Sequence, residues 1–260
     1  MKRVSYAFIA AVVAFALNSC TFLDGDPVTK SFSIDGPYTE LRVSDAFEVT
    51  VSDAVDQAVV TCGSKVMPKV IVETSNGTLR IYLKNCTSSF TEMKVQLPHN
   101  PDLNKVALSG ASDFYSEYGI KGQSISVSAS GSSDFDADME ADEIKLSASG
   151  SSSITGSIAA DAMKVSLSGS SDGVLTGEVG TLSIDLSGSS DICRLVAGSQ
   201  YALSCNECRG TISGSSDAYI NSNGNIKVSL SGSSSLHFTG TAFTGDCSTS
   251  GSSAVIHDEP

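Results

Sequence analysis

A short serine–glycine motif recurs along this chain and constrains its fold more than any other feature of the sequence. The glycines of the eight copies are Gly110, Gly131, Gly150, Gly169, Gly188, Gly214, Gly232 and Gly251. Successive copies are 21, 19, 19, 19, 26, 18 and 19 residues apart. A nearly constant period of this length indicates a solenoid, in which each repeat buries its apolar face by stacking on its neighbours.

The residues around each glycine alternate between apolar and polar. The sixth, fourth and second residues before the glycine are apolar in most copies, as in Ile144, Leu146 and Ala148 before Gly150. The apolar pattern resumes four residues after the glycine, as in Ile154. A period of two is typical of a β-strand with one buried face. The pattern therefore predicts that each repeat has one β-strand before its corner and one after it.

We predict an all-β fold, a parallel β-helix (β-solenoid) with about 19 residues per coil, right-handed by the general preference of crossover connections. The period and the sequence pattern disfavour leucine-rich repeats, hexapeptide helices and calcium-binding nonapeptide rolls. Each motif glycine is predicted to form the corner of a coil, where a Cβ atom would clash. The serines one residue before and two residues after the glycine are predicted to face outward and to bond along the stack and to the turn.

The first residues of the chain indicate export and anchoring. Lys2 and Arg3 precede an apolar segment at residues 4–16, and the sequence LNSC, which ends at Cys20, resembles a bacterial lipobox. We therefore predict a lipoprotein signal peptide at residues 1–19, lipidation of Cys20 and a polar tether to residue 27. The expected location is the outer membrane, anchored through lipid on its periplasmic or extracellular face. An ordinary cleaved signal peptide is the alternative.

Residues 28–100 also carry strand patterns, with a hairpin signal at Asn76-Gly77. We expect these strands to continue the solenoid and to cap its N-terminal end, and a separate small β-domain is the alternative. The repeats then occupy residues 101–257. The polar tail, residues 258–260, is expected to cover the opposite edge.

An acidic column is the first candidate for a binding site. Aspartate occupies the third position after the glycine in five copies, at Asp113, Asp134, Asp172, Asp191 and Asp217. Stacked carboxylates are candidate calcium ligands, but calcium needs six or more converging oxygens, and each coil supplies one carboxylate. We therefore favour capping of the corner backbone by these side chains. No metal and no cofactor is predicted.

Cysteines are the second candidate for a functional or structural role. The cysteines after Cys20 are Cys62, Cys86, Cys193, Cys205, Cys208 and Cys247. An even number outside the cytoplasm predicts disulfides. Cys62 and Cys86 end neighbouring strand segments and form the preferred pair. Cys205 and Cys208 lie in the enlarged repeat close to Cys193, so a bridge across that insertion is also expected. A zinc site or a redox pair at Cys205 and Cys208 is the alternative.

The lipobox, the strand-rich segment and the serial SGSSD corners together resemble the putative auto-transporter adhesin head GIN domain family of bacterial lipoproteins. The resemblance covers roughly residues 28–257 and implies an adhesive surface protein, without assigning binding residues. The formal net charge of −13 disfavours nucleic acid and anionic membrane surfaces as partners.

We predict no catalytic residues and a non-enzymatic envelope lipoprotein. It would present a rigid polar surface for adhesion, with a glycan or a surface protein as ligand and the membrane as partner of its lipid anchor. Two alternatives remain open, a carbohydrate-active β-helix enzyme (a polysaccharide lyase or hydrolase) and a purely structural envelope protein. Paired carboxylates about 5–9 Å apart in a groove would favour the enzyme. The oligomeric state stays open.

Overall fold

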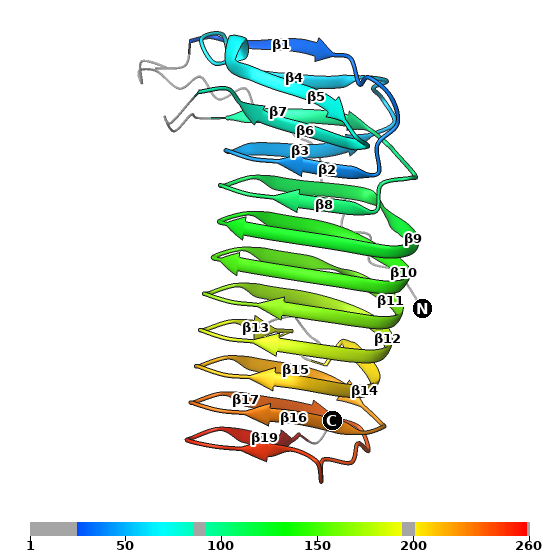
Figure 1. Ribbon diagram of the computed structural model, residues 1–260, viewed down its shortest axis with the longest axis vertical. Helices are drawn as coiled ribbons and strands as arrows, with labels where there is room; N and C mark the ends of the chain where they lie inside the picture. Colours follow the sequence, from blue (N-terminus) through cyan, green and yellow to red (C-terminus); the bar gives the residue numbers. More distant parts are fainter. Residues whose placement is uncertain (1–24, 86–91, 194–200, 259–260) are drawn as a thin grey trace, which may run out of the picture.

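The structure is a computed structural model that describes residues 25–85, 92–193 and 201–258. It is an all-β, parallel β-solenoid of about 8 turns with about 19 residues per turn, as the repeat predicts. Figure 1 shows the coils stacked into an elongated rod. Within the described ranges, the helical structure is the short 3-10 helix η1 (Met67–Lys69), and no helix there is long and apolar enough to cross a membrane.

Each coil of the repeat region has two sides, joined by the serine–glycine corner and by a second bend (Figure 1). The strands are β8 (Lys105–Leu108), β9 (Asp113–Gly131), β10 (Asp134–Gly150), β11 (Ser153–Leu167), β12 (Asp172–Leu186), β13 (Asp191–Ile192), β14 (Leu203–Ile212), β15 (Asp217–Ser222), β16 (Ile226–Leu230), β17 (Ser235–Thr239), β18 (Ser248–Thr249) and β19 (Ala254–His257). Neighbouring coils pair in parallel, so that Phe135 lies opposite both Phe114 and Ile154. Part of the enlarged repeat, residues 194–200, lies outside the described residues. On either side of it β12 pairs in parallel with both β13 and β14.

Residues 28–100 join the same hydrogen-bonded sheet as the repeats. The strands are β1 (Pro27–Phe32), β2 (Glu40–Val43), β3 (Phe47–Ser52), β4 (Ala58–Gly63), β5 (Val70–Ser75), β6 (Thr78–Leu83) and β7 (Met93–Pro98). Because β2 pairs in parallel with β6 and β8, and β3 with β7 and β9, the β2–β3 coil lies between the β6–β7 coil and the first repeat. Strands β4 and β5 pair antiparallel with β7 and β6, and β1 with β4. These antiparallel strands close one end of the solenoid.

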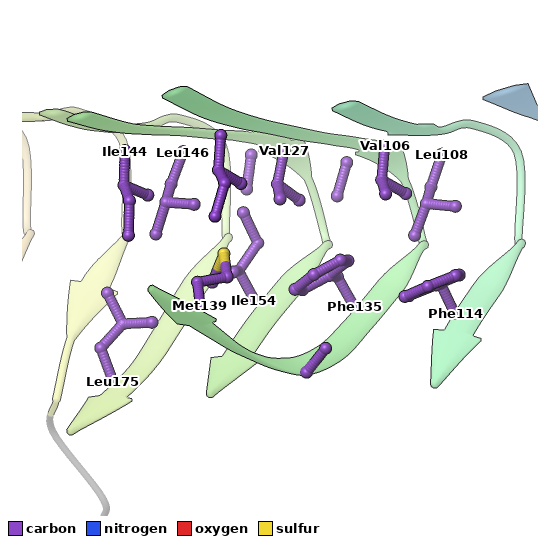
Figure 2. Packing of buried hydrophobic residues seen from close by; sticks show 14 of the residues in the cluster. Val106, Leu108, Phe114, Val127, Phe135, Met139, Ile144, Leu146, Ile154 and Leu175 are labelled. Carbon is purple, nitrogen blue, oxygen red and sulfur yellow. The ribbon is translucent and has the colours of Figure 1, made fainter. Parts of the chain in front are cut away.

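The core is a strip of apolar side chains between the two sides of the coils (Figure 2). Val106, Leu108 and Val127 point from one side toward Phe114 and Phe135 on the other, and all five are at most 2% exposed. The two phenylalanine rings stack with their centroids 5.4 Å apart and an angle of 11° between their planes. Full burial of one such side chain stabilises the fold by about 1.5–3 kcal/mol. The predicted inward columns are therefore the core.

The eight motif glycines lie at the corners between strands, and all have φ between +74° and +84°. Residues that carry a side chain rarely adopt this left-handed backbone conformation, because their Cβ atom crowds the following carbonyl oxygen. Each corner also lies directly against the next one. The Gly150 carbonyl accepts a hydrogen bond of 2.7 Å from the Ser170 amide, and a Cβ atom built on Gly169 would lie 2.6 Å from the same oxygen. Both the dihedral angle and the close stacking thus require glycine.

The serine two residues after the glycine is buried, so the prediction that it faces outward is wrong. Ser133, Ser152 and Ser171 are at most 1% exposed. The Ser171 hydroxyl donates to the carbonyl of Ser168, three residues earlier, at 2.8 Å, and the same bond recurs in most corners. The Ser133 amide also donates to the hydroxyl of Ser152 on the next coil, at 3.3 Å. Because its hydroxyl is hydrogen-bonded inside the corner, the serine is buried at little cost.

A further corner precedes the eight predicted ones, with Asp45 in place of the glycine. Asp45 has φ of 78°, and its carbonyl accepts a hydrogen bond of 2.7 Å from the Ala111 amide, as the glycines do between later coils. Its carboxylate accepts a hydrogen bond of 2.7 Å from the Leu83 amide. Aspartate tolerates the left-handed region better than most residues because its short side chain bonds to nearby backbone. The corner stack therefore extends into the N-terminal coils.

The corner predicts that Gly169→Ala lowers the free energy of unfolding by about 1–3 kcal/mol, because Cβ adds backbone strain and contacts the Gly150 carbonyl. Gly173→Ala is the matched control, since its Cβ would have its nearest neighbours at 3.6–3.7 Å. We expect that control to be neutral or to stabilise by up to about 1 kcal/mol. Urea denaturation followed by circular dichroism measures both. Equal stability of Gly169→Ala and the wild type would contradict the account of the corner.

Candidate functional site

A long groove follows the second bend across consecutive coils. It has a volume of about 840 Å³ and is lined by residues of β9, β10, β11, β12 and β14, together with Asn223. We call it the bend groove. Because stacked strands are about 4.8 Å apart, a strip that crosses six coils is about 24 Å long. The site is therefore long and open rather than a closed pocket.

The floor of the bend groove is a column of small side chains nine residues before the corner glycines. It consists of Gly122, Ala141, Ala160, Val179 and Cys205. These residues lie opposite one another in the parallel register of successive coils. Ala141 and Ala160 are half-buried, and Val179 and Cys205 are buried. These four floor residues are therefore less exposed than the acidic residues that precede or follow them.

Carboxylates flank the floor on both sides. Glu140 and Glu178 precede floor residues, and Asp142 and Asp161 follow them. All four carboxylates belong to exposed residues. Lys121 Nζ lies 2.6 Å from Glu140 Oε2 and is the only cationic side chain among the residues that line this described groove. The resulting negative potential disfavours anionic ligands.

A smaller hollow of about 240 Å³ lies alongside the bend groove at its first three coils, on β9, β10 and β11. We call it the head hollow. It shares Lys121, Glu140 and Ala159 with the groove, so the two form one continuous surface. Tyr118 and Asp138 also line it, and Tyr118 is 39% exposed. The complete site thus has an aromatic ring at one end and a polar strip with a small-residue floor along its length.

The five aspartates considered as calcium ligands lie in one column at the corners. Asp113 Oδ1 accepts a hydrogen bond from the Asp134 amide at 3.2 Å, and Asp191 Oδ1 accepts one from the Asp217 amide at 2.9 Å. The Ser235 hydroxyl donates to the Asp217 carboxylate. Among the described residues no group of three or more His, Cys, Asp or Glu side chains is placed to hold a metal ion. These bonds support the capping role.

The described part of the chain contains no disulfide. Cys86 lies outside it, so the preferred bridge between Cys62 and Cys86 stays a prediction. The Cys193 thiol donates to a backbone carbonyl at 3.1 Å, and burial raises its pKa to about 11. Cys205 and Cys208 face each other at the bend. The hydrogen bond between them lowers the pKa of Cys205 and raises that of Cys208. The expected bridge to Cys193 is therefore not formed in this structure.

At the C-terminal end Asp258 binds to the side of the last coils. Its amide donates to the Phe238 carbonyl at 2.9 Å, and its carboxylate accepts a hydrogen bond from the Tyr201 hydroxyl. The same carboxylate lies 2.9 Å from His237 Nδ1, and the His237 ring stacks on Tyr219. Asp258 therefore fastens the start of the tail to the last coils, and coverage of the edge by residues 258–260 stays a prediction because residues 259–260 lie outside the description.

The fold and site define a solenoid scaffold with a long, open polar groove. The family model described as "Putative auto-transporter adhesin, head GIN domain" matches residues 37–157 and again residues 141–242. The chain therefore belongs to this family, as the sequence resemblance predicts. The family suggests an adhesin of the cell surface or envelope and does not indicate an enzyme.

Solved structures share the fold. A putative adhesin from Parabacteroides merdae is 19% identical with a TM-score of 0.78, and the match covers 90% of this chain and 97% of that one. A putative lipid binding protein from Parabacteroides distasonis is 20% identical with a TM-score of 0.77, over 90% of this chain and 98% of that one. At these identities the likeness shows the fold alone. No curated protein matches the chain.

Sequence reasoning did not find the bend groove. Its signal was present, because Gly122, Ala141 and Ala160 all stand nine residues before a corner glycine, and acidic residues flank the two alanines. The candidate binding site was instead predicted at the column three residues after the glycine, where aspartate recurs in five copies. The bend that makes the floor concave is a property of coil geometry, and no motif residue marks it.

The corner column predicts a pH effect at Asp113. Burial, and then the nearby carboxylates of Asp134 and Glu48, raise the pKa of Asp113. A carboxyl whose pKa is raised by folding binds more protons in the folded state, so its contribution to stability is lost as pH rises through that pKa. Asp113→Asn keeps an oxygen for the Asp134 amide and removes the charge.

We expect the stability of Asp113→Asn relative to the wild type to increase between about pH 3 and pH 6. At pH 7 the variant should be neutral or more stable by less than about 0.5 kcal/mol. Melting temperatures across this range, at fixed ionic strength, provide the measurement. A relative stability that falls with rising pH would contradict the raised pKa of Asp113.

Proposed function

We propose that this protein is a non-enzymatic lipoprotein of the outer membrane that adheres to an extended, uncharged glycan lying in the bend groove. The groove itself carries the proposal, because it is one continuous strip across six coils. Compact ligands are usually enclosed in concave pockets that bury most of their surface. An open strip about 24 Å long suits a linear polymer that crosses one coil after another.

The chemistry of the lining suits sugar hydroxyl groups. Carboxylate and amide oxygens accept hydrogen bonds from hydroxyls, and the groove supplies Glu178, Asp161, Asn206 and Asn223 along its length. The small-residue floor leaves room for the apolar C–H faces of sugar rings. Because these groups repeat with the coils, successive sugar units would meet similar surroundings.

Charge supports an uncharged ligand over an acidic one. The chain has a formal net charge of −13, and most charged side chains that line the bend groove are acidic. A carboxylated or sulfated polysaccharide would approach this surface against electrostatic repulsion. Hydrogen bonding to neutral hydroxyls has no such cost.

The lipid anchor in this proposal is inferred from the amino-acid sequence. Cys20 and the signal peptide at residues 1–19 lie outside the described residues, and the lipobox supports lipidation there. A multiply acylated cysteine holds a protein stably on a membrane, whereas one acyl chain does not. The family's adhesive description agrees with a rod attached at its N-terminal end.

Carbohydrate processing is the competing function, because Glu140 and Asp142 place carboxylates beside the bound chain. A glycoside hydrolase needs a general acid whose pKa is raised by an apolar site. The carboxylates that flank the bend groove are instead on exposed residues of an open strip. This arrangement favours binding without turnover.

The proposal predicts that Ala160→Arg weakens glycan binding at least about tenfold, a loss of roughly 1.4 kcal/mol. The arginine would fill the floor and pair with the flanking carboxylates. The full-length protein in detergent is tested on immobilised xylan, mannan and β-glucan, with polygalacturonate as the acidic comparison.

Ser147→Arg is the matched control, because Ser147 is exposed on β10 and is not among the groove-lining residues. It should bind as the wild type does. Binding of Ala160→Arg at wild-type strength, preference for polygalacturonate, or attachment only to proteins would overturn the proposal. Release of reducing sugar ends by the wild type would favour the enzyme, and absence of any binding would favour a structural role.

A further inference from the structure

We infer that Tyr118 is a stacking platform for one sugar ring at the head of the bend groove, an inference that rests on the proposed glycan binding. Tyr118 lies in β9, lines the head hollow and is 39% exposed. An aromatic ring contributes most to stability when it is buried. This ring contributes less than a core residue would, which leaves its exposed surface available to a ligand.

Two contacts from the N-terminal coils fix the orientation of the ring. The imidazole of His99, just after β7, stacks on Tyr118 with centroids 4.7 Å apart and an angle of 16° between the planes. The amide of Asp53, just after β3, donates to the Tyr118 hydroxyl at 3.2 Å. Asp53 Oδ1 also lies 4.0 Å from His99 Nδ1. A ring that is already held in place loses little conformational entropy when a ligand binds.

Hydrogen-bond acceptors surround the platform. Glu117, Asp138 and Glu140 line the same hollow as Tyr118. Asp138 Oδ1 accepts a hydrogen bond from the Ser157 amide at 2.8 Å, which restricts the orientation of this carboxylate. A pyranose has an apolar C–H face that stacks on an aromatic ring and a rim of hydroxyl donors that carboxylates accept. The clustered negative charge disfavours an acidic sugar at this position.

The head hollow lies beside the first three coils of the bend groove, and Tyr118 on the first of these coils places the platform near one end of the bound chain. The two surfaces meet at Lys121, Glu140 and Ala159. A sugar ring on Tyr118 therefore leads directly to the small-residue floor at Ala141 and the coils beyond it. The platform is a specificity-determining contact for the first sugar unit, while the groove binds the units that follow.

The experiment measures binding of neutral hexasaccharides of xylose, mannose and glucose to the full-length protein by titration calorimetry. For the hexasaccharide that the wild type binds best, Tyr118→Ala should weaken affinity about tenfold or more. Tyr118→Phe keeps the ring and should restore most of the affinity. Tyr115→Ala is the matched control, because Tyr115 is 43% exposed on the same strand and lines neither the bend groove nor the head hollow.

Melting temperatures establish whether the variants fold. If Tyr118→Ala does not fold, Tyr118→Leu repeats the test with a larger apolar side chain. Wild-type affinity of a folded Tyr118→Ala or Tyr118→Leu variant, with Ala160→Arg still defective, would overturn the platform and leave the proposed function standing. An equal loss in Tyr115→Ala would also overturn the platform. Failure of the wild type to bind any neutral hexasaccharide or polysaccharide would instead overturn the proposed function.

Discussion

The rest of the structure depends on one compact arrangement, a left-handed glycine followed by a buried serine that bonds back to its own corner. In the Gly169 corner, Ser171 donates to the Ser168 carbonyl at 2.8 Å, while the Ser170 amide donates to the Gly150 carbonyl of the neighbouring coil at 2.7 Å. The first bond shapes the corner and the second fixes the spacing of the stack. Because most corners of the repeat region contain both bonds, the apolar columns lie in register and the coils stack into a long rod.

That regularity also positions the candidate site. A column of equivalent positions becomes a continuous strip on the surface, so small residues such as Ala141 and Ala160 make a floor and their neighbours Glu140 and Asp161 make its flanks. Nothing in a single coil is a binding site. The surface arises from repetition, which is why a chain-like ligand fits it better than a compact one. The irregular N-terminal coils hold an aromatic ring in place at the head of the strip, where Tyr118 of β9 contacts His99 and Asp53.

The fold class, the period and the inward columns could be predicted because alternation and spacing report directly on strands and stacking. The inward orientation of the Ser171 side chain could not be predicted, because a polar residue is expected on the surface unless its hydrogen bond inside the protein is known. The Asp45 corner was missed because aspartate replaces the diagnostic glycine. The order of the N-terminal coils depends on long-range pairing, such as β2 between β6 and β8, that local patterns do not carry. The groove depends on the concavity of the second bend, which the side chains nearest the glycines do not reveal.

The central claim is that the buried corner hydroxyl holds the coil together, and a comparison of two neighbouring serines tests it most directly. Ser171 is 0% exposed, whereas Ser170 in the same corner is exposed. The free energy of unfolding of Ser171→Ala should fall by about 1–3 kcal/mol, because a carbonyl inside the corner loses its donor. Ser170→Ala should change it by less than about 0.5 kcal/mol. Equal stability of the two variants in urea denaturation would contradict the account.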